Sequence, residues 1–111
     1  MYGGIEGIRI SGPVAKALNV PGEGGYLATK VSSKGLGAQV GLQGGTINAE
    51  IEGTELLLGG DIIVELAGHP VHDNAGAEAA RKAIDEMTEG SEVEIKFLRG
   101  GEILTRKFTL L

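Results

Sequence analysis

Histidine is the commonest general base in enzymes, and this chain has only two histidines, both beside a turn. His69 and His72 flank Pro70-Val71, and Asp73 directly follows His72. A catalytic triad also needs a nucleophile, and no serine lies in a Gly-x-Ser-x-Gly segment or a comparable strained turn. We therefore interpret both histidines as solvated turn residues, and the chain is not expected to be an enzyme.

Metal and phosphate sites find equally weak support. His69, His72 and Asp73 lack the further ligand spacing of zinc sites, and the chain has no cysteine. The Gly-rich stretch 41–46 lacks the lysine that a P-loop places before its threonine. Carboxylate pairs such as residues 85–86 are expected to be solvated surface charges. No cofactor and no metal ion are therefore expected.

The N-terminal part of the chain offers a different kind of site, an edge for an extended peptide. Ile5-Glu6-Gly7-Ile8 leads into the alternating segment Ile8-Arg9-Ile10, and Ser11-Gly12-Pro13 ends it. A Gly-containing bend can direct successive backbone N–H groups at an anion, and a strand edge can accept a peptide as an additional strand. The same residues also fit an ordinary capped edge strand without a ligand.

Composition limits the classes of protein to which the chain can belong. Its 111 residues include 20 glycines, three prolines and no tryptophan, with a formal net charge of −5. The negative charge argues against general nucleic-acid binding, and no stretch approaches the roughly 20 apolar residues that span a bilayer. We expect one globular domain over residues 5–111, with residues 1–4 as a linker or an added segment. Residues 1–4 do not resemble a signal peptide, so any targeting sequence is expected upstream.

The elements that would position a binding edge are short strands and one long helix. Strands are expected at 8–10, 26–31, 46–51, 54–58, 61–66, 92–99 and 102–110. Helices are expected at 13–18 and 75–88, the longer one capped by Asp73 or Asn74, with a helical turn at 38–40. Glu52-Gly53 is a two-residue turn typical of a β-hairpin. The prediction is an α+β fold: a compact antiparallel β-sandwich or partial barrel of five to six strands, with an inserted hairpin at 46–58.

A series of short motifs extends along nearly the whole chain, from residue 5 to residue 110. These motifs are Glu6-Gly7-Ile8, residues 13–21 (PVAKALNVP), 25–31 (GYLATKV), Gly41-Leu42, 58–63 (LGGDII), 68–71 (GHPV), Glu89-Gly90 and 97–101 (FLRGG). Each motif is short, and their order and spacing together give the specificity. The chain resembles a PDZ domain, of the type that follows the trypsin-like domain in bacterial HtrA/Deg serine proteases.

This resemblance implies a binding groove for a peptide C-terminus. In the family, a hydrophobic–Gly–hydrophobic loop donates backbone N–H groups to the peptide carboxylate, and the peptide lies between the following strand and the long helix. The resemblance implies that Glu6, Gly7 and Ile8 supply these donors. The strand contacts would be Ile5, Glu6, Gly7, Ile8, Arg9 and Ile10, and the helix contacts would be Ala77, Arg81 and Ile84. The opposite helix stripe, Ala80, Ala83 and Met87, would belong to the core.

The chain departs from the family pattern at three groove positions, of which Ala77 is small and leaves room. Glu6 stands where a hydrophobic residue is usual, and its carboxylate could repel the peptide terminus or point to solvent. Arg81 occupies a position that is often apolar, and it could pair with an acidic peptide side chain. The resulting hypothesis is a preference for a large apolar C-terminal residue together with an acidic residue upstream.

The resemblance implies a non-catalytic peptide-binding module of an HtrA-like serine protease. Its partners would be C-terminal peptides of misfolded or regulatory proteins and the protease domain of the parent chain. Protein quality control in the periplasm or elsewhere in the bacterial cell envelope is the implied setting. The alternative is a structural or oligomerisation PDZ domain with an unused groove, which Glu6 favours. The 46–58 hairpin would be either a docking surface for the protease domain or a decoration.

Overall fold

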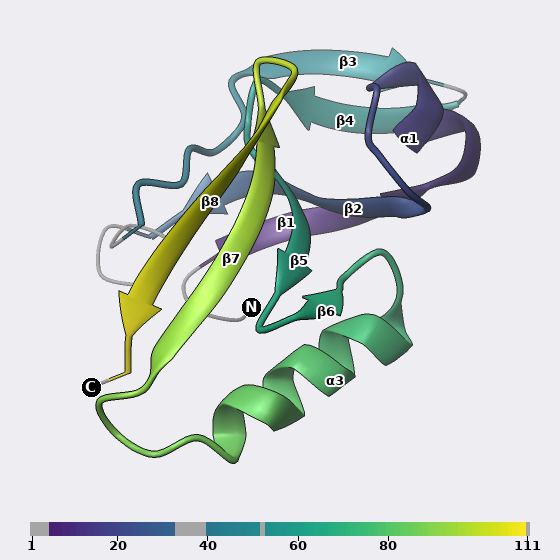
Figure 1. Cartoon of the computed structure of the whole chain (residues 1–111). Coiled ribbons are helices and arrows are strands. Elements are labelled where there is room, and N and C mark those ends of the chain that lie inside the picture. Colours follow the sequence, from purple (N-terminus) through teal and green to yellow (C-terminus); the bar gives the residue numbers. More distant parts are fainter. Residues whose placement is uncertain (1–4, 33–39, 52, 111) are drawn as a thin grey trace.

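Alternating apolar and polar residues build most of the chain into one antiparallel sheet, as the computed structural model shows (Figure 1). The structure describes residues 5–32, 40–51 and 53–110. The elements are β1 (Ile5–Ser11), α1 (Gly12–Ala17), β2 (Gly24–Val31), β3 (Ile47–Ile51), β4 (Thr54–Leu58), β5 (Ile62–Leu66), β6 (His69–Pro70), α3 (Asn74–Asp85), β7 (Glu92–Arg99) and β8 (Glu102–Thr109).

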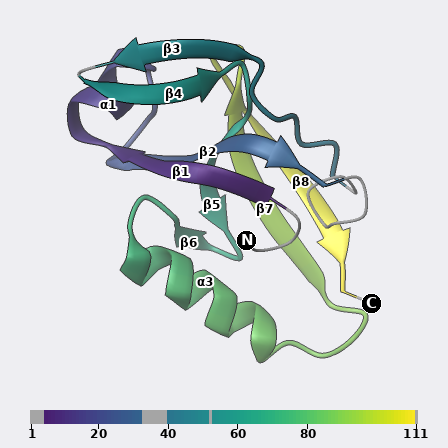
Figure 2. The same cartoon turned by 180° about the vertical axis from the view of Figure 1, so that it is seen from behind.

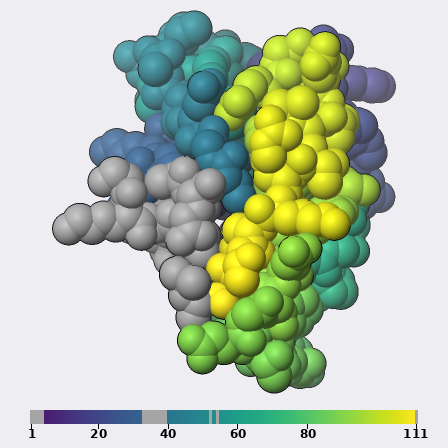
Figure 3. All heavy atoms as spheres, turned by 60° about the vertical axis from the view of Figure 1, so that its left-hand side comes forward, coloured from purple at the N-terminus to yellow at the C-terminus, as the bar shows by residue number. Residues whose placement is uncertain are grey.

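The main sheet has six strands, in the order β1-β2-β5-β7-β8, with β6 paired to β5. The hairpin β3-β4 forms a separate two-stranded sheet. Within the described residues β1 and β8 are the two free edges, so the sheet does not close into a barrel. Figure 3 shows β8 as one outer side of the molecule. The predicted β-rich α+β class, with an antiparallel sheet, a hairpin and two helices in the described part, is confirmed.

Both faces of the sheet are buried, because successive side chains of a strand point to opposite sides. One cluster, which includes α1 and the hairpin, comprises Ile10, Ala15, Val20, Leu27, Leu56, Ile62 and Leu98. The other, which includes α3, comprises Ile5, Ala28, Leu42, Ile63, Val71, Ala80, Ile95 and Phe97. We call these two sides the hairpin face and the α3 face. Figures 1 and 2 show α3 and the hairpin on opposite sides of the sheet.

Several local predictions are confirmed. The hairpin pairs Ile51 with Thr54, and Gly53 adopts a φ of +78° in the turn, a value that favours glycine. Asp73 caps α3, because its Oδ1 accepts a hydrogen bond of 2.8 Å from the backbone N–H of Gly76. β7 has the expected bounds, and Leu98 is buried on the hairpin face.

Two expected boundaries differ from the structure by three residues. β1 begins at Ile5 and not at residue 8, because Ile5, Glu6 and Gly7 already pair with β2. α3 ends at Asp85 and not at residue 88, because the N–H of Met87 donates to Ile84 O, one residue closer than an α-helical bond. The expected helical turn at 38–40 lies largely outside the described residues. Neither helix of the described part is long and apolar enough to cross a membrane.

Candidate functional site

β1 pairs with β2 along one edge, and no strand of the described residues pairs with its other edge. Glu6 lies opposite Lys30 and Gly7 opposite Ala28, so Thr29 is an extra residue that forms a bulge in β2. The hydroxyl of Thr29 donates a hydrogen bond of 3.1 Å to the carbonyl oxygen of Glu6. The bulge therefore fixes the register of the first half of β1.

Glu6, Gly7 and Ile8 belong to β1 and pair with β2, with a register shift between Glu6 and Gly7, and their role as carboxylate donors stays a prediction. The φ of Gly7 is not in the left-handed region. Glycine is needed for a different reason: a Cβ at this position would collide with the carbonyl oxygen of Leu27 and lie 2.8 Å from Cε2 of Tyr26.

The side chains of β1 alternate between the two faces of the sheet. Ile8 lies opposite Leu27, a member of the hairpin-face cluster, and Arg9 lies opposite Tyr26, which packs against the α3-face cluster. Directly opposed residues share a face. The α3 face therefore receives Ile5, Gly7 and Arg9, and the hairpin face receives Glu6, Ile8 and Ile10. Ile5 and Ile10 are buried, whereas Glu6, Ile8 and Arg9 are exposed.

The inward side of α3 includes Ile84 in addition to the expected stripe. Ala80 is fully buried, as predicted, while Ala83 and Met87 are half-buried. Ile84 was expected on the groove wall, but it is only 6% exposed and packs with Val93 and Phe108 in a third cluster. Its side chain is thus occupied by core packing between α3 and the β7–β8 pair.

The other two expected helix contacts remain at the surface. Ala77 is half-buried and Arg81 is exposed. The Nη1 of Arg81 lies 3.8 Å from Oε1 of Glu78, one turn earlier on the same helix. An exposed pair of this kind contributes little to stability, so the guanidinium of Arg81 can exchange partners readily.

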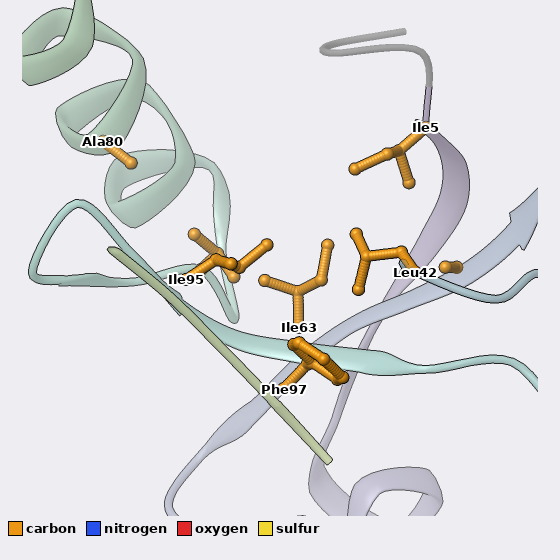
Figure 4. Close-up of a cluster of buried hydrophobic side chains, with 8 residues drawn as sticks. Ile5, Leu42, Ile63, Ala80, Ile95 and Phe97 are labelled. Carbon is orange, nitrogen blue, oxygen red and sulfur yellow. The ribbon is translucent and has the colours of Figure 1, made fainter. Parts of the chain in front are cut away.

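The start of β1 and the middle of α3 border the same apolar cluster. Figure 4 shows Ile5 and Ala80 on opposite sides of this cluster, with Leu42, Ile63 and Ile95 between them. In Figures 1 and 2, α3 runs roughly opposite to β1. A free strand edge and a helix therefore flank one apolar region.

The histidines differ from the prediction in one respect. His72 has a side chain only 23% exposed, and its Nε2 lies 2.7 Å from Oε2 of Glu23 and 3.4 Å from Oδ2 of Asp73. This contact ties the loop before β2 to the start of α3. His69 pairs with Leu66 in the β5–β6 ladder. Within the described residues, no group of three His, Cys, Asp or Glu side chains is arranged to hold a metal ion.

Sequence reasoning missed the ion pair of Asp61 and Arg99. Asp61 is 1% exposed and accepts a hydrogen bond of 2.7 Å from the N–H of Gln43, and Arg99 donates to the carbonyl oxygen of Gly41 at 2.8 Å. Leu42, which lies between Gly41 and Gln43, enters the α3-face cluster beside Ile5 (Figure 4). An acidic residue directly before a buried apolar strand was the available signal.

A shallow depression of about 400 Å³ lies on the hairpin, away from the β1 edge. Its lining comprises Asn48, Ala49, Glu50, Glu55 and Leu56. Glu50 and Glu55 are directly opposed in the hairpin register, and both are exposed. Like charges in this position repel each other.

Comparison with known proteins does not assign the chain to a family. No family model matches the sequence, and no curated protein matches it.

Proposed function

We propose that the chain is a non-catalytic, PDZ-like module that binds the C-terminal segment of a partner protein as an additional strand on β1. The observation that carries this proposal is the free edge of β1 beside α3, both bordering the apolar cluster of Ile5 and Ala80. An unpaired edge presents a row of backbone donors and acceptors, and peptides that add to such an edge gain affinity from main-chain hydrogen bonds. The resemblance of the motif order to PDZ domains points to the same use.

The peptide would lie antiparallel to β1, with its C-terminal residue near Ile5. Its terminal side chain would then contact the apolar cluster between β1 and α3. Ala77 and Arg81 are the helix residues that remain available for contact, since Ile84 is buried. As a part of an HtrA-like serine protease, the module would recognise exposed C-termini of misfolded or regulatory proteins in the bacterial cell envelope. Bond cleavage would be left to the protease domain.

One observation favours a structural role as the second candidate. Glu6 and Arg9 place charged side chains on the free edge. Charged residues on an edge strand commonly prevent pairing with other chains. A structural or oligomerisation domain with an unused edge would have this feature.

Titration of the chain with a library of C-terminal peptides tests the proposal. We expect saturable shifts of the backbone amide signals of Gly7, Ile8 and Arg9, because these residues would gain a strand neighbour. The amides of β8, the other free edge, serve as the internal control and should not shift. Peptides with an amidated C-terminus should bind more weakly, because they lack the carboxylate. If no peptide shifts the β1 signals, the structural role is favoured instead.

A further inference from the structure

The β1 edge presents different chemistry on its two faces. On the α3 face, Ile5 is followed by Gly7 and Arg9, and on the hairpin face Glu6 is followed by Ile8. A peptide paired with this edge would place alternate side chains beside these two sets, because directly opposed residues of an antiparallel pair share a face. The edge can therefore distinguish peptides that differ only in the order of their side chains, as well as peptides that differ in composition.

Of the residues on this edge, Arg9 should discriminate most strongly between different peptides. Its side chain is exposed, and within the described part of the chain it forms no ion pair. Its opposite residue in β2 is Tyr26, which carries no charge to compensate the guanidinium. Glu6, by contrast, lies opposite Lys30, so the sheet already places a cation beside it.

Ile8 supplies a second discriminating contact. This side chain is 37% exposed although it lies in the middle of a strand. An incoming apolar side chain on the hairpin face would remove that surface from water. A charged side chain at the same place would have to lose water against an apolar neighbour without gaining a partner.

Resting on the proposed function, we infer that the β1 edge selects peptides with an acidic residue at position −4 and an apolar residue at position −3, counted from the C-terminal residue as 0. An apolar terminal side chain belongs on the α3 face, opposite Ile5, because the apolar cluster lies there. The alternation then places position −2 opposite Gly7 and position −4 opposite Arg9. Position −3 lies opposite Ile8.

The strand register distinguishes this position-specific preference from a general attraction of the protein to negatively charged peptides. An acidic residue moved by one position, from −4 to −3, leaves Arg9 and meets Ile8 on the other face. Cross-strand ion pairs at exposed positions change affinities by about two- to fivefold. A nonspecific attraction to the arginine would not distinguish two peptides of identical composition and net charge.

The test compares two five-residue C-terminal sequences, Glu-Val-Ser-Ala-Val and Val-Glu-Ser-Ala-Val, extended upstream by the same Gly-Ser residues. Binding of each peptide to the 111-residue chain is measured by calorimetry. We expect the first peptide to bind about two- to fivefold more tightly. Equal affinities would overturn the inference but leave the proposed function standing, whereas absence of binding by both peptides would count against the proposed function itself.

Two charge-reversal variants of the protein provide the second part of the experiment. Arg9→Glu should remove the preference for the first peptide and create one for Lys-Val-Ser-Ala-Val. The matched control is Arg106→Glu, which reverses an exposed arginine on β8, the opposite edge, and should keep the wild-type preference. Because both substitutions are at exposed positions, the backbone amide spectrum of each variant should remain that of a folded chain. Retention of the acidic preference in Arg9→Glu would overturn the inference.

Discussion

Asp61 and Arg99 form a two-pronged ion pair that joins the start of β5 to the end of β7. The Nε of Arg99 lies 2.7 Å from Oδ1 of Asp61, and its Nη2 lies 2.6 Å from Oδ2. The guanidinium carbon also lies 5.2 Å from the centre of the Phe97 ring, within the range of a cation–π contact. Through Gly41 and Gln43 the pair fixes the chain on either side of Leu42, which packs beside Ile5. The ion pair thus supports the cluster beneath the β1 edge.

Replacement of Arg99 by alanine should strongly destabilise the fold. The substitution leaves the buried carboxylate of Asp61 without its cation, and loss of one partner of a buried pair costs about 3–5 kcal/mol. We expect a loss near the lower end, about 3 kcal/mol, because Arg99 is partly exposed. Urea unfolding measures the change, with Arg106→Ala on β8 as a control that should cost less than about 0.5 kcal/mol. Similar losses for the two variants would contradict the supporting role of the pair.

The contribution of this ion pair to the free energy of unfolding should not change between pH 7 and pH 10. The hydrogen bond to Asp61 raises the pKa of Arg99 above its ordinary value, and burial opposes the increase. A raised pKa means that the contribution is fully present below the pKa of the unfolded chain and is lost only as the pH rises through that of the folded chain. For arginine this interval is strongly alkaline. The difference in unfolding free energy between the wild type and Arg99→Ala should therefore be constant over this range, and a steady decline would argue against the pair.

Gly7→Ala should destabilise the fold by about 1–3 kcal/mol, the usual cost of forcing an extra carbon into a packed site. The added Cβ would collide with the carbonyl oxygen of Leu27. Thermal unfolding measures this loss, and Glu6→Ala at the exposed neighbouring position should change stability little. A loss of peptide binding in Gly7 variants would therefore report a disturbed strand and not a lost carboxylate contact. A Gly7→Ala chain as stable as the wild type would show that β1 lies farther from Leu27 than the structure has it.

Ile84 and Arg81 should respond differently to truncation. Ile84→Ala removes a buried side chain and should cost about 2–4 kcal/mol. Arg81→Ala removes an exposed side chain and should cost less than about 0.5 kcal/mol. Peptide affinity should fall more for Arg81→Ala than for Ile84→Ala when both variants are measured at a temperature where they are folded. Arg81→Glu should weaken the binding of acidic peptides selectively. An equal loss of affinity for all peptides would exclude a charge contact.

Glu55→Lys should stabilise the hairpin modestly. It converts the directly opposed pair of Glu50 and Glu55 into an ion pair, a change worth about 0.5–1 kcal/mol. Unfolding at low salt measures the gain, which added salt should reduce. Glu78→Lys, an equal charge change away from the hairpin, is the control and should give no such gain, because it places a second cation beside Arg81. A destabilised Glu55→Lys chain would show that the register of the hairpin differs.

The sequence predicted those elements whose signals are local. Val93, Ile95 and Phe97 alternate with polar residues, and β7 accordingly has its expected bounds. The start of β1 was missed because Gly7 lowers the strand propensity, whereas pairing with β2 determines the actual structure. The burial of Ile84 could not be predicted, since helical spacing alone does not tell exactly which side of α3 the sheet covers. Asp61 and Arg99 are 38 residues apart, and no periodic pattern connects them.

The most direct test of the central claim is the detection of nuclear Overhauser effects between peptide backbone protons and those of β1. The account predicts a ladder of such contacts along Ile5 to Arg9, in antiparallel order, with the C-terminal residue of the peptide near Ile5. It predicts none along β8. A peptide that binds without contacting the β1 backbone, or that pairs with β8 instead, would contradict the account.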